Sequence, residues 1–193
     1  QARGVVNVLR DLLTHGLLAS PERAEGSDAV TIPPLPAEDE AFDREAQNRL
    51  KQEAFLKAGT RCFNQKGFSG TSLDEIAEQL QVSKGAFYYH FANKEALLTQ
   101  CFDYTLDQLE QAVARIEQLE APPAAKLEAA CRHIFVLQNS DQGPLVHFNA
   151  ITALPPEVRQ RLLGRLTSVH ATLENFVAQA AEARQFRDIP PGI

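Results

Sequence analysis

The stretch SLDEIAEQLQVSKGAFYYHFANKEAL, residues 72–97, predicts three short helical segments that follow one another closely. Ser72, Ser83 and Asn93 each precede one segment, and serine and asparagine are favoured N-cap residues. Glu75, three residues after Ser72, completes the pattern of a capping box. The expected segments cover residues 73–79 and 84–90 and a longer helix that begins at residue 94.

Two helices of seven or eight residues joined by a short turn form a candidate helix-turn-helix. A small shared core is expected from Ile76, Ala77, Leu80, Val82 and Phe87. The second helix would then present its other residues outward: Lys84, Gly85, Ala86, Tyr88 and His90. In the major groove of DNA, a lysine can donate to guanine and an alanine can contact a thymine methyl. Small residues at the helix start allow a close approach to the base edges.

The residues around this helix start are suited to phosphate groups. Thr71 and Ser72 offer hydroxyls beside a helix N-terminus, and Tyr88 and His90 offer side-chain donors. Lys94 stands where the third helix begins, and free backbone amides at such a start bind anions. The alternative for Tyr88, His90, Lys84 and Lys94 is an ordinary structural or solvated role, whereas Tyr89 is expected to pack in the core.

In these motifs, the run from about residue 50 to residue 102 resembles the DNA-binding domain of the tetracycline-repressor (TetR/AcrR) family of transcriptional regulators. The matching pieces are FNQKGFSGTS and LDEIAEQLQVSKGAFYYHFANKEALL. The resemblance implies that Tyr89 and Phe91 face the domain core, and that Gln81 replaces a frequent turn glycine. It also implies DNA contacts by Thr71, Ser72, Lys84, Gly85, Ala86, Tyr88, His90 and Lys94.

The rest of the chain also has helical periodicity, so the expected fold class is all-α. A helix is expected from about residue 42 until Gly67 stops it, with Leu50, Ala54, Ala58 and Cys62 on one stripe. Pro122 and Pro123 should break the helix that begins at residue 94. Further apolar periodicity covers residues 126–138, 145–154 and 157–182.

Composition, charge and cysteine spacing indicate the kind of partner and the location to expect. The chain has 193 residues and a net charge of −6, but residues 48–98 hold seven basic and five acidic residues. This local excess of positive charge matters for a partner within a Debye length, about 8 Å. The chain start has no apolar signal core, so a cytoplasmic location without membrane contact is expected. The three cysteines are isolated, and buried thiols are expected.

The segment after about residue 105 is expected to be a helical ligand-binding and dimerisation domain. The resemblance implies a cavity for a small-molecule effector of unknown identity, whose binding changes the spacing of two recognition helices in a homodimer. The pocket candidates are Phe135, His147, Phe148, Ile151, His170, Leu173 and Phe176, with core packing as the alternative for each. His133, His147 and His170 have no local metal-binding spacing, so no metal, cofactor or catalytic site is expected.

The two ends of the chain suggest a further hypothesis. Family members usually continue with two more long helices, so the effector domain is expected to be incomplete at its C-terminus. Residues 1–19 resemble the last helix of such a domain, and residues 20–41 resemble a proline-rich linker. We therefore expect a DNA-binding domain at 42–104, a partial effector domain at 105–193 and either an upstream repressor-like unit or an unusual N-terminal helix.

Taken together, these features predict a sequence-specific DNA-binding transcriptional regulator and not an enzyme. The resemblance implies a repressor whose affinity for a double-stranded operator is lowered by a small ligand. The partners would be operator DNA, the ligand and a second copy or tandem unit. The alternatives are an activator, or a helix-turn-helix used only for protein contacts.

Overall fold

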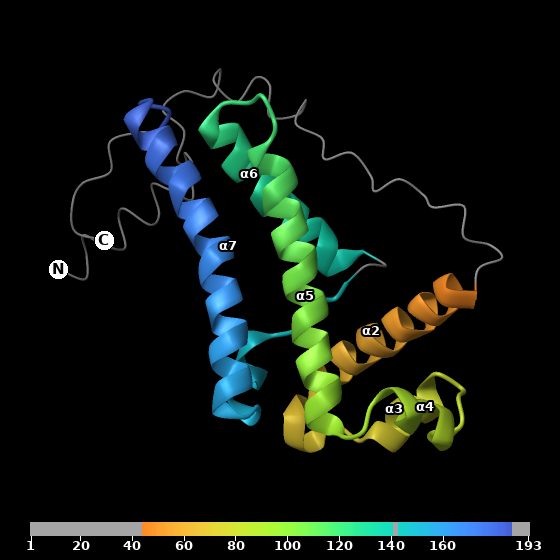
Figure 1. Ribbon diagram of the computed structural model, residues 1–193. Helices are drawn as coiled ribbons and strands as arrows, with labels where there is room; N and C mark the ends of the chain where they lie inside the picture. The colour runs from red at the N-terminus through yellow and green to blue at the C-terminus, as the bar shows by residue number, and fades with distance from the viewer. Residues whose placement is uncertain (1–43, 141–142, 187–193) are drawn as a thin grey trace. The chain divides into compact units, whose positions relative to one another are not determined.

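The computed structural model describes residues 44–140 and 143–186, and its elements are helices joined by short loops (Figure 1). The helices are α2 (Arg44–Gly70), α3 (Leu73–Gln79), α4 (Lys84–His90), α5 (Lys94–Glu117), α6 (Pro123–Asn139), the 3-10 helix η2 (Phe148–Ala153) and α7 (Pro156–Glu182). The all-α expectation is confirmed. The expected helix at 1–19 and the linker at 20–41 lie outside the described residues.

The chain divides into two compact units. Among the described residues, the larger unit contains 44–111, 134–140 and 143–169, and the smaller unit contains 112–133 and 170–186. The boundaries fall within α5, α6 and α7, because the division follows packing and not chain order. The domain boundaries expected from the sequence therefore stay a prediction.

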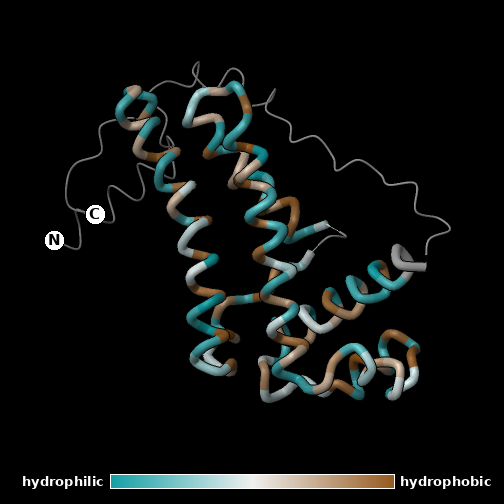
Figure 2. The backbone as a smooth tube through the Cα atoms, in the orientation of Figure 1, coloured by the Kyte–Doolittle hydropathy of each residue, from teal (hydrophilic) through white to brown (hydrophobic). Residues whose placement is uncertain are grey.

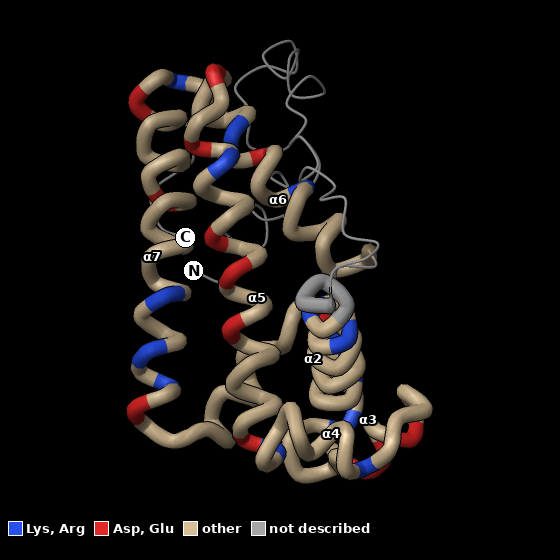
Figure 3. Tube along the Cα trace, turned by 45° about the vertical axis from the view of Figure 1, so that its right-hand side comes forward, with Lys and Arg blue, Asp and Glu red and all other residues tan. Residues whose placement is uncertain are grey.

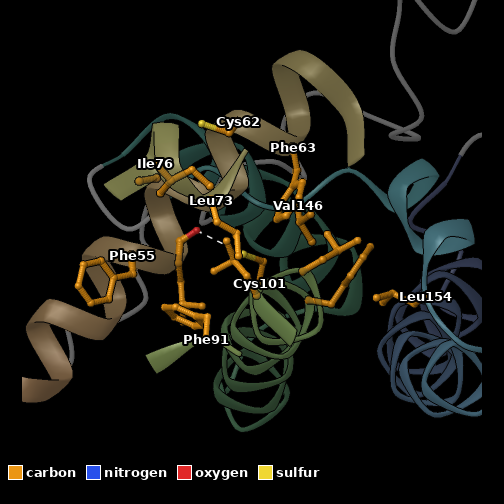
Figure 4. Close-up of a cluster of buried hydrophobic side chains, with 14 of the residues drawn as sticks. Phe55, Cys62, Phe63, Leu73, Ile76, Phe91, Cys101, Val146 and Leu154 are labelled. Carbon is orange, nitrogen blue, oxygen red and sulfur yellow. Dashed lines mark hydrogen bonds between the residues drawn. The ribbon is translucent and has the colours of Figure 1, made fainter. Parts of the chain in front are cut away.

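The core of the larger unit joins α2, α3, α4 and α5 to the segment around η2. Figure 4 shows Phe55 and Phe63 of α2, with Ile76 of α3, among the buried side chains. The Cys101 thiol of α5 donates to the Leu56 carbonyl oxygen at 3.4 Å, and burial raises its pKa to about 12. Helix α2 is thus held against α3 and α5 by close apolar packing.

Helix α2 bends where the sequence predicted a stop. Gly67 has φ 69° and ψ 177°, a conformation that residues with a side chain rarely adopt. The apolar stripe is shorter than expected, because Leu50 and Ala54 are exposed while Ala58 and Cys62 are buried. The buried part of the helix therefore begins at Phe55, where the described core first contacts α2.

Within the larger unit, α5 and α7 are joined by a network of ion pairs. Figure 3 shows acidic positions along α5 and basic positions along the first half of α7. Arg165 lies 2.6 Å from both Asp107 and Glu110 and 3.0 Å from Asp103. Arg161 makes two hydrogen bonds to Asp103, at 2.6 and 2.9 Å. Such paired, fork-like contacts fix the register of two helices.

The smaller unit has its own apolar cluster. Ile116, Ala130 and Phe176 are buried, and Leu119, Leu127 and Leu173 pack against them. Figure 2 shows hydrophobic positions recurring between hydrophilic ones along α5 and α7, as helices with one apolar side require. Cys131 is exposed, so its expected burial is wrong, whereas Cys62 and Cys101 are buried as expected. None of the described helices could cross a membrane.

Candidate nucleic-acid interface

The turn between α3 and α4 is held by backbone hydrogen bonds. The amide of Val82 donates to the Ala77 carbonyl oxygen at 3.0 Å, and the Gln81 amide donates to Glu78 at the same distance. Gln81 has φ 55°, in the left-handed region. Gln81 replaces a frequent turn glycine of the family pattern, and this left-handed conformation costs a residue with a side chain roughly 1 kcal/mol.

Two of the three expected helix caps are present. The Ser83 hydroxyl accepts from the Ala86 amide at 3.2 Å, and the Asn93 side chain accepts from the Ala96 amide at 2.7 Å. Ser72 is the N-cap of α3 but makes no side-chain capping bond. The expected capping box is therefore wrong, because the Glu75 carboxylate instead pairs with Lys66 of α2.

Helix α4 is anchored by one side only. Phe87 and Phe91 are buried, and the Phe87 ring lies 5.3 Å from the Phe91 ring and 5.2 Å from Phe55 of α2. Ile76 and Ala77 of α3 are also buried, and Leu80 and Val82 pack beside them. The predicted helix-turn-helix core is confirmed.

The opposite side of α4 faces outward. Lys84, Gly85 and Ala86 are exposed, and the Tyr88 side chain is partly exposed at 46%. A Cβ atom built on Gly85 would meet no atom of the chain within 4 Å. The fold itself therefore gives no steric reason for a glycine at this position, although glycine in a helix costs about 0.5–1 kcal/mol relative to alanine.

Tyr89 lies on the exposed side of α4 and not in the core. The residue is 86% exposed, so the expected packing in the core is wrong. With about 100° per residue, position 89 lies roughly 200° around the helix from both Phe87 and Phe91. That spacing was visible in the sequence and would have placed Tyr89 on the exposed side. His90 is intermediate in exposure, and its ring lies 5.2 Å from Phe55.

The candidate phosphate-binding residues differ in exposure and in the hydrogen bonds that they already make. Ser72 is exposed. Thr71 is only 4% exposed, and its hydroxyl donates to the Gly67 carbonyl oxygen at 2.8 Å. The hydroxyl is thus engaged within the chain, and its contact with a phosphate stays a prediction that this burial does not favour. The Lys94 ammonium donates to the Thr71 carbonyl oxygen at 3.0 Å and lies 4.5 Å from the centre of the Phe68 ring.

Asp74, in the first turn of α3, contacts two of the candidate residues. Its Oδ2 lies 2.5 Å from the Lys84 ammonium, and its Oδ1 accepts from the Tyr88 hydroxyl at 3.5 Å. The hydrogen bond to this carboxylate raises the pKa of Lys84. Sequence reasoning missed Asp74, because the pairing depends on how α3 and α4 cross.

The expected pocket residues fall in both units, and their role stays a prediction. In the larger unit, Ile151 is buried, the Phe148 ring lies 5.3 Å from Phe102, and Phe135 and His147 are exposed. In the smaller unit, Phe176 is buried, whereas His170 and Leu173 line a hollow of about 380 Å³ on α7. Among the described residues, no group of three or more His, Cys, Asp or Glu could hold a metal ion.

The comparison with known proteins agrees with this geometry. The profile described as "Bacterial regulatory proteins, tetR family" matches residues 55–101, which include α3 and α4. The HTH-type transcriptional regulator YerO of Bacillus subtilis is 41% identical over 68 residues, covering 35% of this chain and 24% of YerO. The HTH-type transcriptional repressor DhaR of a Mycobacterium species is 30% identical over 78 residues, covering 40% of this chain and 39% of DhaR.

The similarity extends beyond the motif in the solved structures. The structure of AibR in complex with isovaleryl coenzyme A and operator DNA is 29% identical, with a TM-score of 0.61, and the match covers 73% of this chain and 77% of that one. The chain spans less than half the length of the two curated relatives above. The helix-turn-helix with its exposed α4 thus lies within a segment that matches the tetR family of bacterial regulatory proteins, and the chain as a whole is similar to AibR.

Proposed function

We propose that this chain is a sequence-specific DNA-binding transcriptional regulator that inserts α4 into the major groove. The proposed base contacts come from Lys84, Gly85 and Ala86, and the proposed contacts to the sugar-phosphate backbone come from Ser72, Tyr88, His90 and Lys94. Tyr89 joins the backbone set because its ring is exposed beside Tyr88. The hydroxyl and the amide of Thr71 already donate within the chain, to the carbonyl oxygens of Gly67 and Phe68.

The observation that carries the proposal is the open space around Gly85. Nothing in the chain lies within 4 Å of where its Cβ would be, and the residue lies at the exposed start of α4. Open space alone does not indicate a partner, since Gly164 of α7 is equally open. At the start of the second helix of a helix-turn-helix, however, the missing side chain suits a partner that must come close. The edges of bases in the major groove require such an approach from the N-terminal part of a recognition helix.

The regulatory part of the proposal rests on relatives. DhaR is a repressor, and the AibR structure contains both operator DNA and isovaleryl coenzyme A. We infer repression that a small ligand relieves, through its different affinity for two spacings of the recognition helices in a dimer. The pocket residues proposed for this ligand are those predicted from the sequence.

The test uses the full chain and DNA fragments selected by their binding to it. Gly85→Gln should weaken binding to the selected duplex at least about tenfold, because a bulky side chain keeps α4 away from contacts worth about 1–3 kcal/mol each. Gly164→Gln is the matched control, since Gly164 is also helical, exposed and without atoms within 4 Å of its Cβ position. Both changes should preserve or raise the free energy of unfolding.

Two results would contradict the proposal. Equal binding by Gly85→Gln and Gly164→Gln, measured by fluorescence anisotropy, would show that the start of α4 does not approach DNA. Absence of salt-dependent binding to any duplex would instead favour a helix-turn-helix used for protein contacts, because neutralising phosphates makes affinity fall with salt.

A further inference from the structure

The Asp74 carboxylate lies among the groups that are proposed to hold DNA. Its side chain is 46% exposed and lies in the first turn of α3. It is 2.5 Å from the Lys84 ammonium and accepts a long hydrogen bond, 3.5 Å, from the Tyr88 hydroxyl. One acidic side chain thus engages both a proposed base contact and a proposed phosphate contact.

This placement has two electrostatic consequences for a nearby duplex. A phosphate oxygen that approaches Lys84 must replace the carboxylate as its partner or share the ammonium with it. The carboxylate and the phosphate also repel each other, and at contact distance this repulsion is well within the Debye length of about 8 Å. Both effects oppose binding to the DNA backbone, whatever the base sequence.

We propose that Asp74 is a specificity-determining residue. Its carboxylate on α3 restrains Lys84 and Tyr88 of α4 and lowers the affinity for DNA of the wrong sequence. The inference rests on the proposed DNA-binding function. In a nonspecific complex, Lys84 gains one exposed phosphate contact and gives up its contact with Asp74, so the net gain is small. In the specific complex, Lys84 gains a hydrogen bond to a base edge, which the wrong sequence does not offer.

The neighbouring residue supplies a matched control. Glu75 lies in the same turn of α3 and pairs with Lys66 of α2, which is outside the proposed contact set. The Glu75 side chain is 36% exposed, close to the value for Asp74. Glu75→Gln therefore removes the same charge from a similar ion pair without freeing a residue of α4.

The experiment measures binding of the full chain to a mixed-sequence duplex and to the duplex recovered by selection. Across a salt series, Asp74→Asn should bind the mixed-sequence duplex about threefold more tightly than Glu75→Gln does. Its salt slope should be steeper, by at most about one phosphate equivalent. Affinity for the selected duplex should rise less, so the ratio of specific to nonspecific affinity should fall. Far-UV circular dichroism confirms that each variant is folded.

A second comparison tests whether Asp74 acts through Lys84. In a Lys84→Ala background, Asp74→Asn should increase nonspecific binding beyond Glu75→Gln by a smaller factor, because the restrained ammonium is gone and only the repulsion of phosphate is relieved. An undiminished gain there, equal effects of Asp74→Asn and Glu75→Gln in the unaltered background, or weaker nonspecific binding by Asp74→Asn would each overturn the inference. If the unaltered chain bound neither duplex, the proposed function would fall with it, and that result is distinct from the other three.

Discussion

The ring of Phe87 in α4 packs edge-on against the ring of Phe55 in α2, with centroids 5.2 Å apart and planes at 66°. Both side chains are buried, and edge-to-face pairs of this kind add about 0.5–1.5 kcal/mol to the burial of their area. This contact determines which side of α4 points inward and therefore which residues point outward.

Phe87→Ala should lower the free energy of unfolding by about 3–5 kcal/mol, because it leaves a cavity beneath α4. Urea unfolding followed by circular dichroism measures the change. Tyr89→Ala, on the exposed side of the same helix, is the control and should change stability by no more than about 0.5 kcal/mol. A loss for Tyr89→Ala as large as that for Phe87→Ala would mean that α4 is rotated from the described orientation.

Gln81→Gly should raise the free energy of unfolding by about 0.5–1 kcal/mol. Gln81 has φ 55°, and glycine adopts this conformation without the steric cost that a side chain brings. Gln111→Gly, at an exposed position inside α5, should have the opposite effect and cost about 1 kcal/mol. Thermal and urea unfolding of the two variants would decide the matter, and a loss of stability in both would argue against a strained turn.

Arg165→Ala should destabilise the larger unit by about 1–3 kcal/mol, because three carboxylates of α5 lose a common partner. The loss should shrink in about 1 M NaCl, where the remaining repulsion between Asp103, Asp107 and Glu110 is screened. Unfolding at low and high salt measures both effects.

Arg161→Ala serves as the comparison for the Arg165 change. Its side chain is about half exposed and contacts Asp103 alone among these acids, so its removal should cost less. If Arg161→Ala cost as much as Arg165→Ala, the shared partner would not be the source of the stability.

One thiol should react rapidly in the folded chain. Cys131 is exposed, whereas Cys62 and Cys101 are buried. Burial raises the pKa of both buried thiols, that of Cys101 to about 12, so at pH 8 little reactive thiolate forms there. Titration with a thiol reagent should give one fast equivalent in the native state and three after unfolding. Cys131→Ser should remove the fast equivalent, and a fast phase that survived this change would show that a buried cysteine becomes accessible.

The features that were predicted well have local causes. Gly67 ends the straight part of α2, Ser83 and Asn93 cap the next helices, and Gln81 takes the left-handed turn, each through atoms only a few residues away. The buried positions of α3 and α4 followed from helical spacing. Tyr89 is the exception: the family pattern implies a buried side chain there, whereas the helical spacing assigns it to the exposed side, where the structure has it.

The features that were missed depend on distant partners. Glu75 bonds to Lys66 and not to the N-cap, the bend in α2 turns Thr71 inward, and the crossing of α3 and α4 brings Asp74 to Lys84. The exposure of Leu50 shows the same dependence, since the described core contacts α2 only from Phe55 onward.

The order of amino acids by itself determined where the helices begin and end, that the chain is all-α, and that α3 and α4 form a helix-turn-helix. Hydrogen bonds within a turn and the period of the helix act over a few residues and can be read along the chain. Only the tertiary structure decided which polar side chains of the motif are free and which are already engaged. That choice depends on contacts between helices, and neither the spacing nor the type of a residue specifies its partner across such a contact.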